Sequence, residues 1–319
     1  MKHGCILQKI YLIVGNLQLT IFKAEISDYV EFNLTIFIPT YNRPALLETC
    51  ISSIKRSLES TEISYEILVV NEAPIDVNLH YDNITILNYG KEIMPCNAMY
   101  FALLNAKGKY FLRIDDDNEI DADLIPSLYN YITNHRDIAY CGALGKREDG
   151  SISNPGTVFS KNFKISLRKR NISNKDYDVD LVDNVYIMNP ALIELDKFYL
   201  SCRFFPWSFE DGYDQLRLKK LNFRVVVLPY AETTHHTHRG EVNLKQAYHY
   251  GRSKFLMYRC IFKFSFVKSI TLSTAGLLVL PYIYRTDRAN LRSLFLACRY
   301  YLNGIKDAFG FIKNNQCLE

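Results

Sequence analysis

Three consecutive carboxylates, Asp115, Asp116 and Asp117, follow an apolar run and precede Asn118. Adjacent carboxylates repel one another, and a hard divalent cation with oxygen ligands is the usual partner that offsets this repulsion. Alternate side chains of an extended chain point the same way, so Asp115 and Asp117 are expected on one side and Asp116 on the other. An acidic loop that caps the next helix is the alternative. The place at the end of a predicted strand favours the cation.

A second acidic pair, Glu210 and Asp211, lies before a predicted helix. A carboxylate held near a hydroxyl can act as general base, which contributes roughly 10²–10⁴-fold to a rate. Repulsion between two close carboxylates also raises one of their pKa values. Alternatively, both residues favour the start of the helix through its dipole. We expect Asp214 and Arg217 to form a salt bridge on that helix.

Three of the seven histidines lie within four positions, at His235, His236 and His238. An imidazole added to carboxylates makes a mixed site that suits Mn²⁺ as well as Mg²⁺. The alternative is a solvated loop. The sequence therefore offers an acidic triplet, an acidic pair and a histidine cluster as candidate chemical groups, and the elements between them must bring them together.

Those elements alternate between short apolar runs, typical of buried strands, and stretches with helical spacing. Strands are expected at 34–39, 65–70, 83–89, 110–114, 181–188 and 223–228, and helices from Pro44 and at 97–106, 121–134, 191–195 and 214–221. This alternation predicts an α/β domain with a mostly parallel sheet. Ligands of such sheets bind beyond the carboxyl ends of the strands. Polar clusters lie at those ends, at 40–43, 71–72 and 115–118.

The remaining segments are less regular. Residues 143–178 are polar and are expected to form a flexible loop or small hairpins, and the chain after His238 is expected to be helical. The first 32 residues have no A-x-A-like cleavage site, which argues against a signal peptide; we expect a strand pair or a partly ordered leader. The chain is thus divided into a leader (1–32), a main domain (33–240) and a helical tail (241–319).

The tail is basic, because residues 245–319 contain twelve Lys or Arg and three Asp or Glu. Basic and apolar residues alternate in it, which fits an anionic membrane surface better than nucleic acid. The apolar stretch Ser269 to Tyr284 is shorter than the roughly 20 residues of a spanning helix, so an interfacial or buried helix is expected. The tail is either a monotopic membrane foot or a set of helices packed on the main domain.

The eight cysteines are scattered, and none forms a CxxC pair. We expect reduced, mostly buried thiols in a reducing compartment, and no zinc site built on cysteine.

Four segments together resemble the family 2 glycosyltransferases of GT-A fold, particularly bacterial enzymes of surface-polysaccharide assembly. They are 34–43 (LTIFIPTYNR), 66–71 (EILVVN), 108–119 (GKYFLRIDDDNE) and 209–217 (FEDGYDQLR), and the resemblance covers roughly residues 33–240. It implies an α/β fold with a Rossmann-like, mostly parallel but mixed sheet flanked by helices, and a helical C-terminal extension. It also implies inverting transfer of a hexosyl or deoxyhexosyl group.

The implied partners are a nucleotide-diphosphate sugar as donor, a glycan or lipid-linked sugar as acceptor, and a divalent cation, Mn²⁺ or Mg²⁺. A nucleic-acid partner is not expected. The implied location is cytoplasmic, at the inner face of the plasma membrane if the tail contacts lipid.

The resemblance also assigns roles to residues. It makes Asp211 the catalytic base, with Glu210 as its acidic neighbour. The metal ligands would be Asp117 and Asp115 with His235, or with His236 as runner-up. The donor would be bound by the residues Pro39, Thr40, Tyr41, Asn42, Arg43, Asn71, Asn97, Asp115 and Asp116.

Two positions depart from the family pattern. Asn71 stands where the family usually has an aspartate that reads a uracil ring, which leaves the nucleobase open, although an amide oxygen can still accept a hydrogen bond from a base. Cys96 replaces an arginine that commonly precedes Asn97, so that contact to the donor phosphates is open, and Asn97 could instead be a helix N-cap.

Two alternative functions make different demands on the sequence. A nucleotidyltransferase would need a phosphate loop with glycine and lysine, which the turn Thr40 to Arg43 lacks. A catalytically inactive relative, serving as a nucleotide-binding or scaffold subunit, is consistent with Asn71 and Cys96, whereas the retained Asp117 and Asp211 argue for an enzyme.

Overall fold

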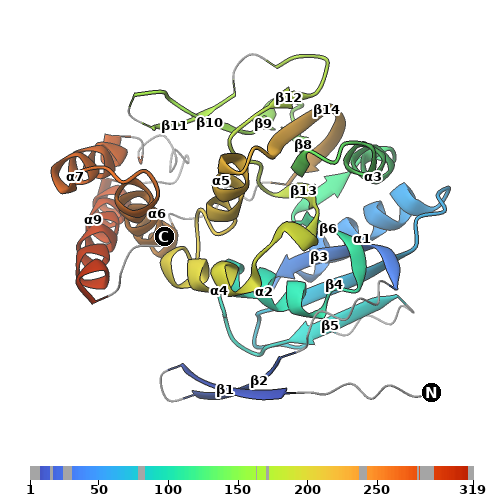
Figure 1. Ribbon diagram of the computed structural model, residues 1–319, viewed down its shortest axis with the longest axis horizontal. Coiled ribbons are helices and arrows are strands. Elements are labelled where there is room, and N and C mark those ends of the chain that lie inside the picture. The colour runs from blue at the N-terminus through green and yellow to red at the C-terminus, as the bar shows by residue number, and fades with distance from the viewer. Residues whose placement is uncertain are drawn as a thin grey trace.

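The computed structural model describes residues 8–14, 17–23, 31–77, 83–162, 164–169, 172–236, 243–278, 280 and 291–314. Within them one mixed sheet of ten strands forms the centre of the fold (Figure 1). Its path runs in the order β12 (Tyr177–Asp178), β14 (Arg224–His235), β8 (Ile138–Arg147), β13 (Val185–Met188), β6 (Gly108–Ile114), β3 (Phe32–Thr40), β4 (Tyr65–Asn71) and β5 (Ile84–Asn88). Two short strands, β7 (Asn118–Ile120) and β9 (Ile152–Asn154), pair with β14 and β8.

The half of the sheet that contains β6, β3, β4 and β5 is parallel, as is the pair β8 and β14, whereas β13 runs antiparallel between β6 and β8. Parallel neighbours need a crossover, and helices supply it. The carboxyl ends of β3, β4 and β6 therefore meet at one edge, next to the start of β13, whose Val185 pairs with Ile114 of β6. This arrangement confirms the expected mixed α/β fold.

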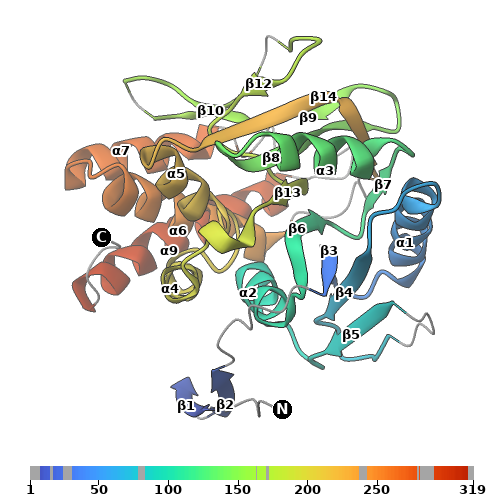
Figure 2. The same ribbon diagram turned by 45° about the vertical axis from the view of Figure 1, so that its right-hand side comes forward.

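Helices cover both faces of the sheet (Figure 2). Helices α1 (Pro44–Leu58) and α3 (Leu124–Asn134) pack on the face that contains Ile36, while α2 (Pro95–Asn105), α4 (Leu195–Phe204) and α5 (Gly212–Lys220) pack on the face that contains Phe37. Neighbouring strand residues point to opposite faces, so a strand buried on both sides reads as a continuous apolar run. This accounts for the unbroken run in β3.

Most of the expected strands and helices of the main domain are present, although β14 extends to His235 and the helix expected at 191–195 is the short η1 (Pro190–Leu192). Helix α4 and strand β8 are absent from the expectations. Gly142 and Gly145 in this strand weaken its signal. Each is in close contact with another segment: a Cβ on Gly142 would lie 2.6 Å from Val182, and one on Gly145 would lie 2.8 Å from Asn154. The polar region after β8 contains a small hairpin, β10 (Thr157–Phe159) with β11 (Ser166–Arg168), as expected.

The tail is helical, as expected, and packs against the main domain. It comprises α6 (Leu244–Leu256), η2 (Met257–Ile261), α7 (Phe266–Ala275), η3 (Gly276–Leu278) and α9 (Leu291–Asn314). Glycines let α6 and α9 approach closely, since a Cβ on Gly251 would lie 2.1 Å from the Tyr301 carbonyl oxygen. Phe204 and Phe205, at the end of α4, belong to the same apolar cluster as α6 and α9. None of the helices in the described ranges is both long and apolar enough to cross a membrane.

Within the N-terminal leader, β1 (Gln8–Val14) and β2 (Leu17–Lys23) form an antiparallel pair, the first of the two expected possibilities. The expected helix in Ser269 to Tyr284 corresponds to the end of α7 and η3 up to Leu278, and its last residues lie outside the described ones.

Candidate functional site

A cavity of about 900 Å³ opens at the carboxyl edge of the sheet. Four of the parts of the chain that line it are the turn after β3, the end of β6, the loop before α5, and helix α6 of the tail. The first two are where parallel sheets place ligands. The other two bring residues that follow position 206 to the same space.

The side chains of the acidic triplet point to opposite sides, as the alternation of side chains in an extended chain predicts. Asp115 and Asp117 line the cavity, whereas Asp116 is fully buried. Asp116 accepts a hydrogen bond from the Thr40 hydroxyl at 2.7 Å and pairs with the Arg43 guanidinium at 2.5 Å. Burial raises the pKa of Asp116 to about 7, although Arg43 and Thr40 oppose the shift. Asp116 therefore fixes the turn after β3 instead of facing a ligand.

Asp117 is held between Arg43 and His235. Its Oδ2 lies 2.8 Å from Arg43 Nη1, and its Oδ1 lies 3.4 Å from His235 Nε2. Burial alone would raise the pKa of Asp117, but the hydrogen bond with His235 and the charge of Arg43 outweigh burial and lower it. The same hydrogen bond raises the pKa of His235. Asp117 thus remains ionised and faces the cavity with His235.

Arg113, which the sequence reasoning did not select, connects the two acidic groups. It is nearly buried in β6, and its guanidinium lies 2.9 Å from Asp115 Oδ1, 3.3 Å from Glu210 Oε1 and 3.4 Å from Asp211 Oδ2. A charged residue is seldom buried unless it is paired. The arginine in the otherwise apolar run 110–114 was therefore a usable signal, and its spacing of two residues from Asp115 places both on one face of the strand.

The second acidic pair sits on a tightly constrained loop. Asp211 is buried and Glu210 is partly buried, and both line the cavity. Ser208 and Phe209 have φ angles of 63° and 74°, a left-handed conformation that costs energy in residues other than glycine. The Phe209 ring packs over Gly212, where a Cβ would lie 2.4 Å from the ring. Strained backbone of this kind needs support from its surroundings.

Asp211 has the electrostatics of a base that titrates near neutrality. Burial raises its pKa to about 7; the Arg113 guanidinium opposes this shift, and the Glu210 charge adds to it. Asp214, in the first turn of α5, instead pairs with Arg217 at 3.0 Å, which confirms the expected salt bridge.

Helix α6 supports this loop through Trp207, which lines the cavity. The Ser253 hydroxyl donates to the Trp207 carbonyl oxygen at 3.1 Å, the His249 ring lies 5.8 Å from the indole, and Lys245 Nζ lies 5.8 Å from it. Burial lowers the pKa of His249 to about 4, so this ring is neutral at pH 7. Spaced by four, these three residues share one face of the helix. The tail therefore forms part of the site.

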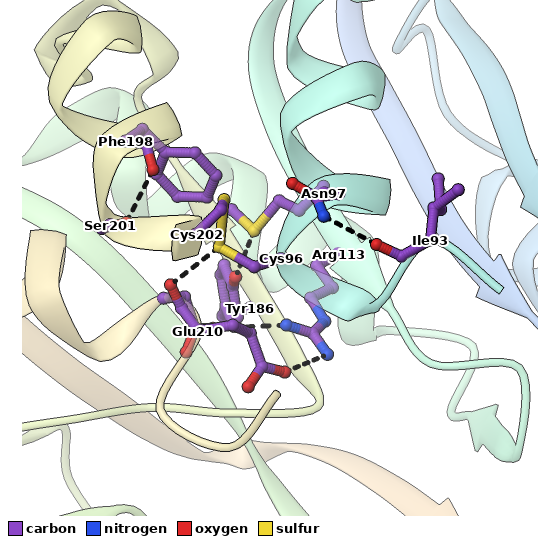
Figure 3. Close-up of a disulfide and its surroundings, with 11 residues drawn as sticks. Ile93, Cys96, Asn97, Arg113, Tyr186, Phe198, Ser201, Cys202 and Glu210 are labelled. Carbon is purple, nitrogen blue, oxygen red and sulfur yellow. Dashed lines mark hydrogen bonds and ion pairs between the residues drawn. A yellow bond between two sulfur atoms is a disulfide. The ribbon is translucent and has the colours of Figure 1, made fainter. Parts of the chain in front are cut away.

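A disulfide between Cys96 and Cys202 joins α2 to α4 beside this loop (Figure 3). The Cys96 amide donates to the Pro206 carbonyl oxygen at 3.2 Å, and its Sγ lies 3.5 Å from the Glu210 carbonyl oxygen. The expectation that all cysteines are reduced is therefore wrong, and Cys260 is also disulfide-bonded. The error arose because the two half-cystines lie 106 residues apart and form no local motif.

The residues expected at a metal site are only partly together. No group of three His, Cys, Asp or Glu side chains in the described ranges is arranged to hold a metal ion. Asp117 and His235 face each other, whereas the His236 ring contacts Glu148 at 2.8 Å and Glu119 at 3.3 Å. His236 is therefore directed away from Asp117. His238 lies outside the described residues.

Only some of the residues expected to bind a donor line the cavity. Pro39, Thr40, Tyr41 and Arg43 line the cavity together with Asp115. Asn42 is exposed, with a φ of 54° that asparagine tolerates better than most residues.

Asn71 and Asn97 make internal contacts instead. The Asn71 amide is buried and donates to the Ile75 carbonyl oxygen and to Asn88 Oδ1. Asn97 Nδ2 donates to the Ile93 carbonyl oxygen at 2.7 Å, and α2 begins two residues earlier, so Asn97 is not an N-cap. The interpretation of both residues as donor contacts finds no support in this geometry.

Glu72, next to Asn71, lines the cavity in its place. Its Oε2 accepts hydrogen bonds from the Ile93 and Met94 amides at 2.7 and 2.8 Å. Burial raises the pKa of Glu72, and these two hydrogen bonds oppose the shift. The other carboxylate oxygen remains able to accept a hydrogen bond from a ligand.

Two sequence comparisons are consistent with this site. Residues 35–182 match the family model described as Glycosyl transferase family 2. The chain is 28% identical over 172 residues to a poly(ribitol-phosphate) beta-glucosyltransferase of Bacillus spizizenii. That match covers 49% of this chain but only 24% of the relative, so the chain spans about a quarter of that protein's length.

The fold is similar to that of solved structures. One is a crystal structure of S. aureus TarS residues 1–349 in complex with UDP-GlcNAc, with a TM-score of 0.52 and 15% identity over 86% of this chain and 80% of that one. Another crystal structure of TarS 1–349 gives a TM-score of 0.51 and 14% identity over 88% and 90% of the two chains.

Proposed function

We propose that the protein transfers a sugar from a nucleotide-diphosphate sugar to an acceptor hydroxyl with inversion, since residues 35–182 match the family model described as Glycosyl transferase family 2. The observation that carries the proposal is the linkage of two acidic groups across one cavity by Arg113, which contacts Asp115 on one side and Asp211 on the other. One group faces the donor, and the other supplies a base.

In this mechanism Asp211 accepts the proton of the acceptor hydroxyl. The acceptor oxygen forms a bond to the anomeric carbon while the bond from that carbon to the diphosphate oxygen breaks, and a single displacement inverts the centre. Arg113 holds Asp211 in place and favours its ionised form, since the guanidinium opposes the effect of burial on the pKa. Glu210 pairs with the same guanidinium at 3.3 Å and keeps it oriented.

Asp117 and His235 would hold a divalent cation, Mn²⁺ or Mg²⁺. Two protein donor atoms that face one cavity fit a cation whose remaining ligands are phosphate oxygens and water. Such an ion offsets negative charge on a leaving diphosphate. Asp115 lines the same cavity, but Arg113 already occupies its Oδ1.

For the substrates we propose a uridine nucleotide sugar and a phosphate-bearing polyol or glycan polymer of a bacterial cell surface. The poly(ribitol-phosphate) relative and the UDP-GlcNAc complex of TarS support these classes. Glu72 is the residue suited to accept a hydrogen bond from the uracil ring, because its carboxylate lines the cavity beside the position where the family has an aspartate.

The test is transfer from UDP-glucose and UDP-GlcNAc, each with Mn²⁺, to poly(ribitol phosphate), read by mass spectrometry. Asp211→Asn is the matched inactive control. Transfer by the wild-type protein, lost in the variant, is expected. Uridine diphosphate binding without transfer from any tested donor would instead favour a catalytically inactive, nucleotide-binding subunit.

We further propose that α9 contacts an anionic membrane from the cytoplasmic side. One exposed stripe of this helix combines Phe295 and Leu302 with Arg299 and Lys306, at spacings of three and four residues. Phe295 is 70% exposed. A helix face of this composition suits the boundary between headgroups and acyl chains, and the cytoplasmic leaflet carries the negative charge that basic residues prefer.

Vesicle sedimentation tests this contact without deleting α6, which lines the cavity. Phe295→Asp should weaken binding to phosphatidylglycerol vesicles and leave the affinity for UDP unchanged. Tyr230→Asp, an exposed aromatic on β14, is the matched control. Equal binding of wild type and Phe295→Asp would contradict the proposed membrane contact.

A further inference from the structure

The basic side chains that line the cavity are, with one exception, paired with carboxylates. Arg43 pairs with Asp116 and Asp117, and Arg113 pairs with Asp115 and the acidic pair 210–211. The two remaining matched groups are His235, which faces Asp117, and Lys245, which pairs with Glu92.

Lys254 is the exception. It lines the cavity from α6, and no carboxylate in the described ranges lies within ion-pair distance of its ammonium group. The end of its stem is packed, since a Cβ on Gly276 would lie 3.4 Å from Lys254 Cδ. Burial lowers the pKa of this lysine. A desolvated ammonium without a counter-charge is unfavourable unless a ligand provides the negative group.

The surroundings of Lys254 differ from the acidic wall. None of the described residues that line the cavity from the tail and the β10–β11 hairpin is a carboxylate, and Thr157, Ser166 and Tyr250 bring hydroxyl groups to this surface. The hairpin rests on the tail through the Phe159 ring, whose centroid lies 5.1 Å from that of Phe262. The hairpin lies within residues 35–182, which match the family model, whereas α6 lies outside them.

We propose that Lys254 binds a phosphate group of the substrate, in a subsite formed by α6 and the β10–β11 hairpin. The phosphate completes the charge balance of the cavity, and the hydroxyl groups nearby can donate to its remaining oxygens. The source is either the acceptor or the diphosphate of the donor. This inference rests on the proposed function for the identity of the two substrates, but the binding itself requires no transfer.

The experiment uses the full chain carrying Asp211→Asn, with Mn²⁺ present, so that binding is measured without turnover. Probes are sn-glycerol 3-phosphate for an acceptor phosphate and UDP for the donor diphosphate, both followed by isothermal titration. Lys254→Met keeps the packed stem and removes the charge. We expect Lys254→Met to weaken the affinity for one of the two probes by about tenfold or more, as for the loss of a charge-assisted hydrogen bond.

Lys254→Arg should retain affinity within about threefold, because it preserves the charge. The matched control is Lys220→Met, at the exposed end of α5 outside the cavity, which should change neither affinity. Loss confined to glycerol phosphate assigns the subsite to the acceptor, and loss confined to UDP assigns it to the donor. Unchanged affinity for both probes in Lys254→Met, with an unchanged melting temperature, would overturn the inference.

If Lys254→Met is unstable, the same comparison is made with Lys254→Gln, and a second readout is the salt dependence of probe binding. Absence of transfer by the wild-type protein would count against the proposed function alone, since the Lys254 effect on probe binding is measured in an inactive background.

Discussion

Arg113 Nη1 lies 3.4 Å from Asp211 Oδ2, although the two residues are 98 positions apart in the sequence. The arginine comes from the central strand β6, and the carboxylate comes from the N-cap position of α5. Their contact joins the rigid sheet to the loop that bears the proposed base. The chemistry of the site depends on this link between Arg113 and Asp211.

Replacing Asp211 by asparagine should reduce sugar transfer by at least about 10²-fold, because a positioned general base contributes roughly that amount. The affinity for UDP with Mn²⁺ should stay within about threefold of wild type, since this carboxylate acts on the acceptor. Initial rates of transfer and titration of UDP measure the two effects. Turnover close to wild type would show that another group is the base.

The rate of transfer should rise as the pH increases through about 7, the pKa of buried Asp211, because only the ionised form accepts a proton. Arg113 opposes the raised pKa, so Arg113→Met should move the midpoint of the rise to higher pH. Profiles of kcat/KM against pH for both proteins provide the measurement. A midpoint that stays in place or moves to lower pH would contradict this electrostatic role.

Asp117→Ala and His235→Ala should each abolish the part of UDP binding that depends on Mn²⁺. Wild-type protein is stabilised by about 2.7 kcal/mol when a ligand is present at 100 times its Kd. The metal-dependent increase in melting temperature with UDP should therefore disappear in both variants. His236→Ala is the control, since this ring contacts Glu119 and Glu148 instead. An equal loss in the control would contradict the assignment.

Removing the Ser253 hydroxyl should lower kcat roughly 2–10-fold and leave the KM for the donor nearly unchanged, since a neutral hydrogen bond contributes about 0.5–1.5 kcal/mol. The hydroxyl supports the Trp207 carbonyl oxygen and with it the strained residues before Glu210. Ser253→Thr should restore much of the loss, whereas Ser273→Ala, which removes a buried hydroxyl within α7, should not alter kcat. A Ser253→Ala effect limited to the melting temperature would indicate a purely structural contact.

Replacing Cys202 by serine should lower the free energy of unfolding by about 2–4 kcal/mol under non-reducing conditions, because the disulfide restricts a long loop of the unfolded chain. Denaturant unfolding with and without a reductant measures the change. A reductant should therefore lower the free energy of unfolding of the wild type more than that of the variant, which lacks this disulfide. Equal stability of the two proteins without reductant would mean that Cys96 and Cys202 are not joined in solution.

Much of the fold follows from local pattern. The runs in β3, β4 and β6 are apolar because both faces of these strands are covered, and each is followed by polar residues at the functional edge. The strand β8 escaped prediction because Gly142 and Gly145 serve contacts with Val182 and Asn154 that are remote in sequence. Local propensity does not encode such contacts.

The sequence predicted the parts of the site that depend on residues close together in the chain. It did not predict the parts that depend on contacts between residues far apart in the chain. The placement of Asp115 and Asp117 on one side follows from strand alternation. The inward turn of Asn71 depends on Asn88 of the neighbouring strand, and the pairing of Cys96 with Cys202 depends on how α4 meets α2. Both are decided by tertiary packing.

Helix α6 supplies one wall of the cavity and the support for Trp207. A ribosome adds about 5–20 residues per second, and the N-terminal part of the chain emerges first. The acidic triplet and the proposed base are therefore synthesised well before the helix that completes their surroundings. The order of synthesis places α6 after the main domain, so a nascent chain that has folded as far as residue 236 holds the acidic groups of the site in an unfinished cavity.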